Sequence, residues 1–501
     1  MTQYLIGLDN GGTNTKAVIF DTKGRTIASA SQRTEMLSLG NGRTERDMEK
    51  LWLVNCQVLR KVIESAGISS EAIIGLSFSG HGKGLYLWGK DGKPSYNGIV
   101  STDTRAYKYP EQWQADGTAE RVFEKTFQQI LPMQPVSLLK WLQDHEPEVI
   151  EKTQWVFGVK DYIRYRLTGL AAAEITDMSG SNLVNLKTGT YDKTLLEAFG
   201  LEAIDKQLPP LKYATDIAGY ITEASADLTG LKVGMPVAAG MFDIDASAIA
   251  MAISDSEHLC IIAGTWSINE YISKTPVVNK SVMMNSLYCI PGYYLIEECS
   301  PTSAGNNEWF IDEFMGAEVI EAKKAGVSIY AYMNAMVAKV DPLETDILFM
   351  PHLYGSNYNP RAKASLIGMD SSHSKGQIAR AVYEGIAFSH RIHVEKLLAN
   401  NPHFTTARLG GGVVKSDVWV QIFADVLNMP IEIIDTEELG AFGAAMAAGV
   451  AAGVYQDLRE AAKILVTVKK VVYPIAEHVS IYEGKFQHYK KAENLLSSLW
   501  S

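Results

Sequence analysis

Two stretches of the chain share one layout, and this repeat constrains the fold more than any other feature. The first is YLIGLDNGGTNTKAVIFD at residues 4–21, and the second is LCIIAGTWSINEYI at residues 259–272. Each has an apolar run, a short turn containing Gly and Thr, and a second apolar run, which is the pattern of two strands joined by a tight turn. We therefore expect two halves built on the same plan.

Further apolar runs follow each hairpin and alternate with amphipathic stretches. Residues 48–65 precede the run AIIGLSFSG, and residues 376–399 precede ARLGGG. This alternation predicts α/β domains with mixed sheets covered by helices. The boundary is expected near residues 245–255, which gives domains of 1–248 and 249–501. A cleft between two such halves is a natural place for a ligand.

Size and charge narrow the class of protein. The chain has 501 residues, of which 47% are apolar, and can bury a large core. Its net charge of -11 and its lack of a basic run argue against a nucleic-acid partner, because phosphate backbones are bound by clustered Lys and Arg. The cysteines have no metal-ligand spacing, and the chain begins directly with an apolar strand. We expect reduced thiols and a cytoplasmic location.

The segment LGAFGAAMAAGVAAGVY, residues 439–455, resembles a membrane span because it carries no charge. It only approaches the length that a spanning helix needs, which is about 17 residues or more. Its bulk is Ala and Gly, which allow close approach of neighbouring elements. The segment therefore predicts a buried, closely packed helix, and no membrane partner is expected.

The usual phosphate-binding motifs are absent. SFSGHGKGL at residues 77–85 has Gly84 where a P-loop needs Ser or Thr, and Ser77 where it needs its first glycine. If a nucleotide binds, the two hairpin turns must hold its phosphates. Thr13 and Thr265 would then supply hydroxyls, the turn amides would supply N–H groups, and Asp9 would position Mg²⁺ through water.

Phosphoryl transfer needs a group that removes the proton of the acceptor hydroxyl, and a carboxylate is the common choice. In PVAAGMFDIDASAIAMAI, Asp243 and Asp245 lie between an apolar strand and an Ala-rich helix. Asp245 is as compatible with a helix N-cap as with a catalytic base. Asp243 is the better candidate for the base because it directly follows the strand, where ligands bind in open α/β sheets.

With these motifs, the chain resembles the FGGY carbohydrate kinases of the sugar kinase, Hsp70 and actin superfamily. The matching stretches cover nearly the whole length: GLDNGGTNTKAVIFD, STDTR, DYIRYRLTG, GMPVAAGMFDIDA, AGTWS, RAVYEGIAF, LGGGVVKSDVWVQIFADVLNMPI and EELGAFGAAMAAG. The resemblance implies an α/β fold of two ribonuclease H-like, actin-like ATPase domains, with the active site in the interdomain cleft. It also implies ATP and Mg²⁺ as cofactors and a homodimer as the assembly.

The resemblance assigns roles to individual residues of this sequence. Asp9 lies at the metal-linked position, and Asp243 falls on the general base. The first phosphate turn includes Thr13, Asn14 and Lys16, and the second includes Gly264 and Thr265. The nucleotide side includes Gly305, Gly412 and Ser416, and the sugar side includes Gly80, His81, Asp103 and Arg105.

Each of these patterns also has a simpler explanation. His81 alone is as typical of a turn histidine bonded to nearby backbone as of a ligand. Asp103 and Arg105 are compatible with a surface ion pair of little energetic value, or with a polyol pocket that needs both donors and acceptors. His390 and His393 have helical spacing for a metal but no third ligand in a recognisable pattern.

The expected activity is ATP-dependent phosphorylation of a terminal hydroxyl of a keto sugar or polyol. A pentulose such as L-xylulose is the first choice, and D-xylulose, ribulose and 3-keto-L-gulonate are alternatives. Lys83, beside His81, is compatible with a site for a carboxylated sugar and equally with a solvated lysine. A second hypothesis is a sensor of the same superfamily that binds sugar and nucleotide without transferring phosphate.

Overall fold

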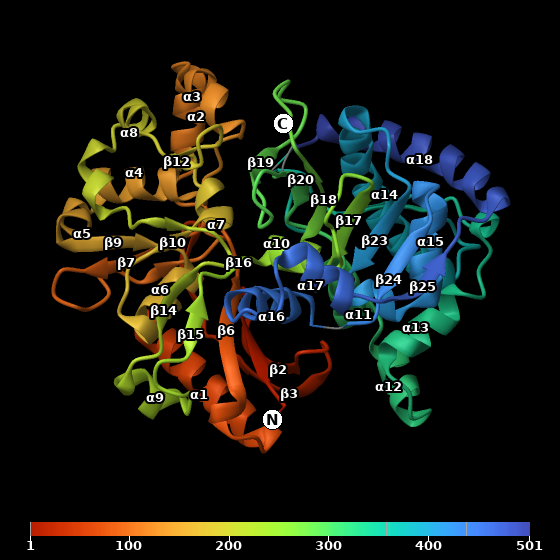
Figure 1. Ribbon diagram of the computed structural model, residues 1–501. Helices are drawn as coiled ribbons and strands as arrows, with labels where there is room; N and C mark the ends of the chain where they lie inside the picture. The colour runs from red at the N-terminus through yellow and green to blue at the C-terminus, as the bar shows by residue number, and fades with distance from the viewer. Residues whose placement is uncertain (1, 357–358, 360, 437, 501) are drawn as a thin grey trace. The chain divides into compact units, whose positions relative to one another are not determined.

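Both predicted hairpins are present, each within a mixed sheet (Figure 1). The computed structural model describes residues 2–356, 359, 361–436 and 438–500. They divide into two units. The first unit contains the chain up to Ser254 together with Ile272–Ile296 and Thr436–Val466, and the second contains Asp255–Tyr271, Glu297–Asp435 and Thr467 onward.

In the first unit the opening hairpin lies at the centre of the sheet. Strands β1 (Tyr4–Asn10) and β2 (Asn14–Asp21) are antiparallel, and β1 also pairs in parallel with β6 (Ile73–Gly80). The strand order is β14-β15-β6-β1-β2-β3, with β16 pairing to β6. Parallel and antiparallel neighbours therefore share one sheet, as the sequence predicts.

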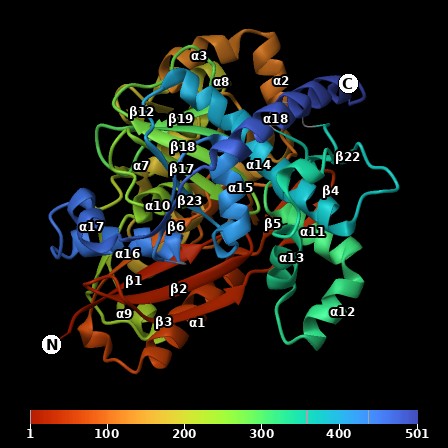
Figure 2. The same cartoon turned by 90° about the vertical axis from the view of Figure 1, so that its right-hand side faces the viewer.

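Helices cover both faces of this sheet. Helix α1 (Met48–Ala66) packs on β2 and β3 (Thr26–Arg33), and α16 (Leu439–Ala451) packs on β1 and β6. Figure 2 shows α16 above these strands and α1 below them. Side chains alternate along a strand, so Gly7 and Asp9 lie on the same face of β1.

Helix α16 confirms the prediction of a buried helix rich in small residues. Its residues from Ala441 to Gly449 are all buried. A Cβ on Gly7 would lie 1.8 Å from the Ala441 carbonyl oxygen, and a Cβ on Gly443 would lie 2.1 Å from the Ala246 carbonyl oxygen. The backbones of α16, β1 and α10 (Asp243–Ala250) therefore approach so closely that only glycine fits.

Other elements of the first unit complete its cores. The hydrophobic cluster around α1 and β6 includes Trp52, Phe78 and Phe157, and a second cluster includes Trp113 and Phe199. The remaining strands are β4 (Leu37–Gly40), β5 (Arg43–Arg46), β7 (Tyr86–Gly89), β8 (Gly98–Ile99), β9 (Thr153–Phe157), β10 (Ala173–Glu174), β11 (Val184–Asn185), β12 (Thr190–Tyr191), β13 (Leu211–Lys212), β14 (Ile217–Tyr220), β15 (Pro236–Ala238), β16 (Met241–Phe242) and β19 (Met284–Leu287). The remaining helices are α2 (Lys108–Ala115), α3 (Thr118–Thr126), α4 (Pro135–His145), α5 (Pro147–Lys152), α6 (Val159–Thr168), α7 (Ile175–Ser179), α8 (Lys193–Phe199), α9 (Glu223–Thr229) and α17 (Leu458–Leu465).

The second unit repeats the arrangement of the first. Strands β17 (His258–Ala263) and β18 (Ser267–Ser273) form the second hairpin, and β17 pairs in parallel with β23 (Thr406–Gly410). The sheet that contains this hairpin has the strand order β19-β20-β18-β17-β23-β24-β25. An antiparallel partner on one side of the central strand and a parallel partner on the other occur in both units.

Helices α14 and α15 pack against one another beside the second sheet, and α18 packs on α15. The elements of this unit are β20 (Tyr294–Ser300), β21 (Leu348–Met350), β22 (Ser365–Ile367), β24 (Ile431–Ile434), β25 (Val468–Val472), α11 (Gly305–Phe314), α12 (Gly316–Lys324), α13 (Ile329–Val337), α14 (Lys375–Asn400), α15 (Asp417–Leu427) and α18 (Ala476–Ser497), in addition to the strands above.

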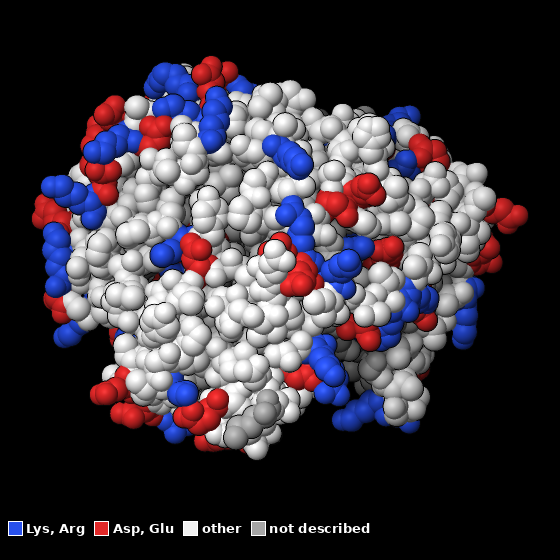
Figure 3. Space-filling view, viewed as in Figure 1, with Lys and Arg blue, Asp and Glu red and all other residues white. Residues whose placement is uncertain are grey.

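Three further observations bear on the sequence predictions. Cys56, Cys260, Cys289 and Cys299 are buried, and none of the four forms a disulfide. Within the part of the chain that the structure describes, no helix is long and apolar enough to cross a membrane. Basic and acidic side chains are interspersed over the face drawn in Figure 3.

Candidate active site

The carboxyl ends of three parallel strands meet at one edge of the first sheet. In register, Asn10 of β1 and Phe242 of β16 both pair with Gly80 of β6. The residues next to these positions are Asp9, His81 and Asp243. The backbone N–H of His81 donates to the Asn10 carbonyl at 3.0 Å, which fixes the start of the loop after β6. Three residues that the sequence placed in the site are thus brought to one edge.

Asp9, in β1, lies beside the first residues of helix α16. A Cβ on Gly440 would lie 3.0 Å from the Asp9 carboxyl and 3.0 Å from the Ser79 hydroxyl oxygen. Burial raises the pKa of Asp9, and Ser79 and Lys16 partly oppose this shift. The Oδ1 atom of Asp9 is buried without a hydrogen-bond partner. A carboxylate oxygen in this state fits a hydrated cation, because such an oxygen only accepts hydrogen bonds and an unsatisfied buried acceptor is costly.

The turn after β1 is exposed at Thr13 and Asn14. Its shape is fixed by backbone contacts, since the Gly11 N–H donates to the Asn14 carbonyl at 3.1 Å and the Thr34 N–H donates to the Thr13 carbonyl at 2.9 Å. Lys16 forms an ion pair of 2.7 Å with Glu438. The turn can therefore present its backbone amides and the Thr13 hydroxyl to an anion.

Asp243 is the first residue of helix α10, and Phe242 is the N-cap position. Burial and, to a lesser extent, the negative charge of Asp9 raise the pKa of Asp243 to about 8, against an opposing effect of Lys83. A carboxyl with a pKa near neutrality is suited to accept a proton in catalysis. The Phe242 N–H donates to the Thr176 hydroxyl at 2.9 Å, which fixes the backbone directly before the carboxyl.

Asp245 has a different environment from Asp243. It is fully buried, and its Oδ1 accepts the Cys289 N–H at 3.0 Å. Asp245 is the third residue of α10 and binds the segment that follows β19, so it is not the N-cap that the sequence allowed. The geometry separates the two aspartates that the sequence left as alternatives.

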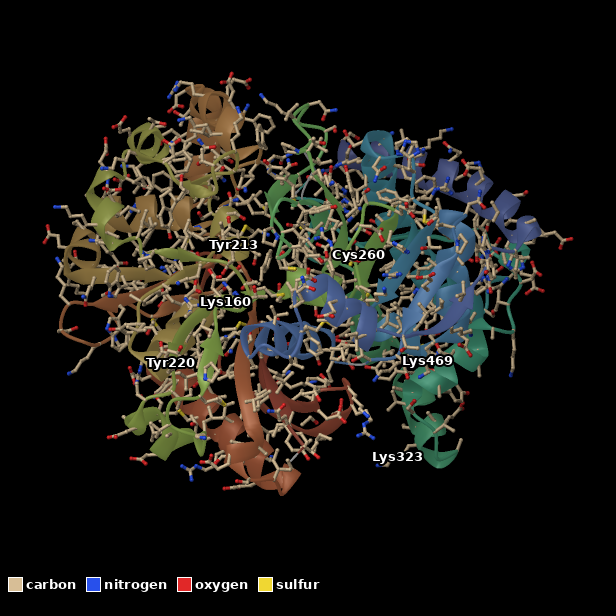
Figure 4. All side chains as sticks on the ribbon, viewed as in Figure 1. Lys160, Tyr213, Tyr220, Cys260, Lys323 and Lys469 are labelled. Atoms are coloured by element: carbon tan, nitrogen blue, oxygen red, sulfur yellow. The ribbon has the colours of Figure 1, made fainter. Side chains whose placement is uncertain are left out.

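A buried group of charges surrounds the end of β16, and the sequence analysis missed it. Lys160 Nζ lies 3.1 Å from Asp177 and 3.4 Å from Glu174, and all three side chains are buried. Lys160, labelled in Figure 4, lies within the first unit. Burial raises the pKa of Glu174 to about 7, and it also raises the pKa of Asp177. The group orders α6 and α7 next to Asp243.

Arg164 connects this group to the segment between β15 and β16, a few residues before the candidate base. Its guanidinium forms an ion pair of 2.9 Å with Asp161 and donates to the Ala239 carbonyl. The spacing of Lys160 and Arg164, four residues apart among apolar positions, was a readable signal in the sequence. Charged residues on a helix face that is otherwise apolar indicate a buried ionic network.

Lys83 has a left-handed backbone conformation, with φ of 62°. Its N–H donates to Asp177 Oδ1 at 3.1 Å, and its ammonium lies 5.2 Å from the centroid of the Phe242 ring. The positive charge lowers the pKa of Asp243. Lys83 is therefore close to the candidate base and is held there by buried groups.

His81 is buried, with 4% of its surface exposed. Its Nε2 lies 3.0 Å from the Tyr86 hydroxyl, and its Nδ1 lies 3.5 Å from the Gly82 carbonyl. Burial lowers the pKa of His81 to about 3, with contributions from Arg46 and Lys160. The ring is thus neutral near pH 7.

Gly80 makes room for a helix. A Cβ at this position would lie 2.8 Å from Val159 Cγ1 and 3.3 Å from Lys160 Cβ. The absence of a side chain therefore allows α6 to approach β6. The resemblance places Gly80 on the sugar side, but the space beside its missing side chain is filled by α6.

Asp103 and Arg105 form a buried ion pair, not a surface pair. Arg105 Nη2 lies 2.7 Å from Asp103 Oδ2 and 2.7 Å from Glu45 Oε1. The Thr44 N–H also donates to Asp103 at 2.7 Å. Burial opposes ionisation of Arg105, but the two carboxylates raise its pKa. In this structure the two residues bind each other and β5.

In the second unit, glycines gather near the turn after β17. Gly264 and Thr265 form the turn, and the position of a Cβ on Gly305 would lie 3.8 Å from Thr265 Cα. Gly411 has φ of 93°, and a Cβ there would lie 2.3 Å from the Ala263 carbonyl oxygen. Gly412 has open space at its missing Cβ. This end of the second sheet can admit a ligand close to the backbone.

Ser416 is the N-cap of α15. Its hydroxyl accepts the Trp419 N–H at 3.2 Å and donates to Asn334 Oδ1 at 2.7 Å. Its side chain is therefore already engaged in the unit's own structure. A ligand contact from this residue would come from its backbone or would require a rearrangement of the cap.

His390 and His393 participate in buried hydrogen bonds. His390 Nε2 lies 2.8 Å from the Ser303 hydroxyl, and His393 Nδ1 lies 2.9 Å from Glu298. Among the residues that the structure describes, no cluster of His, Cys, Asp and Glu could hold a metal ion by itself. These two histidines are explained by polar contacts within the core.

Comparison with known proteins gives the family. Residues 4–250 match the N-terminal domain of the FGGY family of carbohydrate kinases, and residues 259–452 match its C-terminal domain. The chain belongs to the FGGY family of carbohydrate kinases, so it is a carbohydrate kinase, and ATP is its second substrate.

Similar proteins include sugar kinases of several names. The L-xylulose/3-keto-L-gulonate kinase of Escherichia coli K12 is 36% identical, covering 98% of this chain and 96% of the relative. A xylulose kinase structure from Lactobacillus acidophilus has a TM-score of 0.90 at 25% identity and covers 99% of both chains. A gluconate kinase structure from the same organism has a TM-score of 0.89 at 25% identity, covering 100% of this chain and 99% of the other. The predicted two-domain α/β kinase fold is confirmed.

Proposed function

We propose that the protein transfers the γ-phosphoryl group of ATP to a terminal hydroxyl of a keto sugar, with Asp243 as the general base. The observation that carries the proposal is the position and pKa of Asp243 at the edge of the first sheet. Its pKa of about 8 is close to working pH, where a carboxylate removes a hydroxyl proton effectively.

In the proposed reaction, the carboxylate of Asp243 accepts the proton as the hydroxyl oxygen forms its bond to phosphorus. The bond between that phosphorus and the β–γ bridging oxygen breaks, and ADP leaves. The turn after β1 offers N–H groups and the Thr13 hydroxyl to the transferred group, where charge is spread over the equatorial oxygens. Lys16, which already pairs with Glu438, adds positive charge beside this turn.

A magnesium ion would be held at Asp9 through water. The fit rests on the buried, unpartnered Oδ1 atom, which only accepts hydrogen bonds. When bound, the ion neutralises charge on the phosphates. Asp9 would orient its water ligands, and the buried position of this carboxylate would keep them in one arrangement.

The nucleotide is assigned to the second unit. Gly264 and Thr265 would contact phosphate, and Gly305 and Gly412 would allow the nucleoside to lie against the backbone. Ser416 would contribute only through its backbone while its hydroxyl caps α15. The sugar side remains with His81, with Asp103 and Arg105 as the ion pair that orders β5.

L-xylulose is the first choice of substrate. The assignment is supported by the name of the Escherichia coli relative and by the likeness to a xylulose kinase structure. Lys83 makes an acidic sugar such as 3-keto-L-gulonate a second candidate. The charge of Lys83 lowers the pKa of Asp243. A sugar carboxylate bound near Lys83 would weaken this effect and raise the pKa of Asp243 again.

Replacement of Asp243 tests the proposal. In Asp243→Asn, kcat should fall by about 10² or more, which is the usual loss for a general base, and ATP should bind with nearly unchanged affinity. Asp116→Asn, which changes an exposed aspartate that caps Thr118, is the matched control. Unchanged turnover in Asp243→Asn would refute the assignment of the base.

A substrate panel tests the sugar class. We expect kcat/KM to be highest for L-xylulose among L-xylulose, D-xylulose, L-ribulose, D-ribulose, 3-keto-L-gulonate and glycerol. If glycerol outranks every ketose, the keto sugar is the wrong substrate class. If 3-keto-L-gulonate ranks first, the acid is the substrate and L-xylulose is a secondary one.

A further inference from the structure

Helix α7 holds the peptide group that directly precedes the candidate base. The helix packs beside β16, which ends at Phe242 (Figure 1). The backbone N–H of Phe242 donates to the Thr176 hydroxyl oxygen at 2.9 Å. Both residues are buried, and Thr176 has no exposed surface. An N–H group in such a place is costly to leave without an acceptor, so this contact ties Phe242 to α7.

The contact joins α7 to the first turn of α10. Phe242 is the N-cap residue of α10, and Asp243 is the first residue of the helix. In a capping box, the third helical residue accepts the N–H of the N-cap residue. The third residue of α10 is Asp245, whose Oδ1 accepts the Cys289 N–H at 3.0 Å. For the Phe242 N–H, the acceptor comes from a different element of the first unit.

Glu174 orients the side chain of Thr176. The Thr176 hydroxyl donates to Glu174 Oε2 at 2.7 Å, and the Thr176 N–H donates to Glu174 Oε1 at 2.8 Å. Glu174 is itself buried and lies 3.4 Å from Lys160 Nζ. An N–H group only donates, so the Thr176 oxygen is the acceptor for Phe242 whichever charge Glu174 carries. The two contacts from one carboxyl therefore fix the position of the Thr176 oxygen.

The next residue of α7 holds a second segment of the site. Asp177 Oδ1 accepts the Lys83 N–H at 3.1 Å, and Asp177 Oδ2 lies 3.1 Å from Lys160 Nζ. The ammonium of Lys83 lies 5.2 Å from the centroid of the Phe242 ring. Adjacent residues of α7 thus hold the segment that carries Lys83 and the segment that carries the candidate base.

We propose that Thr176 is a positioning residue for Asp243, because its hydroxyl, oriented by Glu174, fixes the peptide group from which the base follows. This inference rests on the proposed function, since Thr176 acts only through the base. A general base must lie within hydrogen-bond reach of the proton that it removes, and a misplacement of about 1 Å can cost about 10² in rate. In Thr176→Val the buried Phe242 N–H loses its acceptor, and its peptide group must move to find another.

Hydrogen–deuterium exchange tests the contact without turnover. In the full chain, with exchange resolved to single amides by fragmentation in the mass spectrometer, the Phe242 amide should exchange about tenfold faster or more in Thr176→Val. In Thr176→Ser the rate should stay within about threefold of the unchanged protein, because the serine hydroxyl can accept the same N–H. Unchanged protection in Thr176→Val, or an equal loss of protection in Thr176→Ser, would overturn the proposal.

Kinetics with the sugar that ranks first in the substrate panel test the consequence for the reaction. In Thr176→Val, kcat should fall about tenfold to a hundredfold with KM for ATP within about threefold, and Thr176→Ser should restore kcat to within about threefold. Thr229→Val is the matched control, because Thr229 is equally buried, donates to the Ser225 carbonyl at 2.7 Å and accepts the Leu231 N–H at 3.3 Å. Equal falls in kcat in the two valine variants would mean a general structural effect and would overturn the proposal.

A double-mutant cycle with Asp243→Asn separates this inference from the proposed function. Adding Thr176→Val to Asp243→Asn should lower kcat by less than about threefold further, because the position of a missing base has no effect. A further loss as large as that in Thr176→Val alone would overturn the positioning role.

The failure of the inference and the failure of the proposed function give different results. If Asp243→Asn alone keeps full activity, or if no sugar of the panel is phosphorylated, the proposed function fails, and the role of Thr176 fails with it. If Asp243→Asn has the expected loss but Thr176→Val has none, only the positioning role is refuted.

Discussion

The turn after β1 and the turn after β17 have the same surroundings of strands but different chemistry. Each follows a central strand with an antiparallel partner on one side and a parallel partner on the other. Near the first turn, Asp9 is opposite Lys16, whereas at the second turn Ala263 is opposite Ser267. The comparison teaches that the repeated scaffold supplies backbone amides twice, whereas the reaction proposed above uses charged side chains of the first copy.

Glycines also differ in what they do in the two units. In the first unit Gly7 and Gly443 allow helix α16 to touch the sheet and α10, so the space is filled by the protein itself. In the second unit Gly412 has open space at its missing Cβ. Gly7 and Gly443 therefore serve close packing, whereas Gly412 leaves space for a ligand.

The largest expected effect is a fall in kcat that follows a change near the first turn and not a change in the second. Asp9→Asn should lower kcat by about 10² to 10³, the range for losing one electrostatic element of a transition state, with ATP affinity changed by less than about threefold. Thr265→Ala should instead raise KM for ATP about tenfold and leave kcat within about threefold. Steady-state kinetics at varied ATP and Mg²⁺ give both numbers.

One outcome would contradict this difference between the two turns. If Asp9→Asn and Thr265→Ala lower kcat by similar factors, the two turns share the reaction chemistry. Ser273→Ala, a change at the far end of β18, is the control for an alteration of the second hairpin that should leave both constants unchanged.

The pH dependence should belong to the first unit alone. Because the pKa of Asp243 is about 8 and the base must be ionised to act, kcat/KM for the sugar should rise about tenfold per pH unit up to about pH 8 and then level off. ATP binding, measured by calorimetry over the same range, should change little by comparison. A rate that is flat between pH 6 and pH 8 would contradict the role of Asp243.

Lys83 should shift that profile by a smaller amount. Its charge lowers the pKa of Asp243, so Lys83→Met should move the rise in kcat/KM to higher pH and reduce the rate at pH 7 about threefold to fivefold. Lys187→Met is a matched control, because Lys187 also lies over an aromatic ring, with its ammonium 5.5 Å from the centroid of Phe127. A profile that does not move in Lys83→Met would mean that its charge does not reach the base.

The smallest expected effect is on stability. Burial raises the pKa of Asp243 in the folded protein from its usual 3.8 to about 8, so ionisation disfavours folding, increasingly from about pH 4 to pH 8. Asp243→Asn should therefore stabilise the first unit by about 1 kcal/mol or more at pH 9 and have little effect at pH 4. Denaturant unfolding at the two pH values measures this difference.

Replacement of Asp245, two residues further along α10, should have the opposite effect on stability. Asp245→Asn should destabilise the protein at both pH values. A carboxylate oxygen of Asp245 accepts the buried Cys289 N–H, and the amide oxygen that replaces it is a weaker acceptor. Stabilisation in Asp245→Asn, or none in Asp243→Asn at pH 9, would contradict the roles assigned to the two carboxyls.

Local patterns in the sequence predicted the repeated hairpins and the buried α16, because turn residues and Ala/Gly-rich composition act over a few positions. The sequence did not reveal which strand α16 covers. Gly7 reads as an ordinary strand residue, and its partner Ala441 is more than four hundred positions away. Long-range contacts of this kind depend on the completed packing.

The candidate site was predictable only in part. Asp9, His81 and Asp243 stand at strand ends, where motif and topology agree. Arg46 and Tyr86 carry no local signal, since an arginine in a polar stretch and a tyrosine in a strand are typical of surface and core positions. Arg46 binds the turn and Tyr86 lies beside His81 only in the folded chain, and no short pattern encodes these contacts.

The position of α16 in the chain has a consequence for biosynthesis. The helix that packs against β1 and β6 begins at Leu439, about 140 residues after the preceding segment of the first unit ends at Ile296. At about 5–20 residues per second, a ribosome needs roughly 7–28 s to make that stretch, and during this time Leu5, Gly7 and Phe20 have an uncovered sheet face. A nascent chain arrested before residue 436 should therefore be bound by chaperones that recognise exposed apolar strands, and it should be released once Ala451 has left the ribosome.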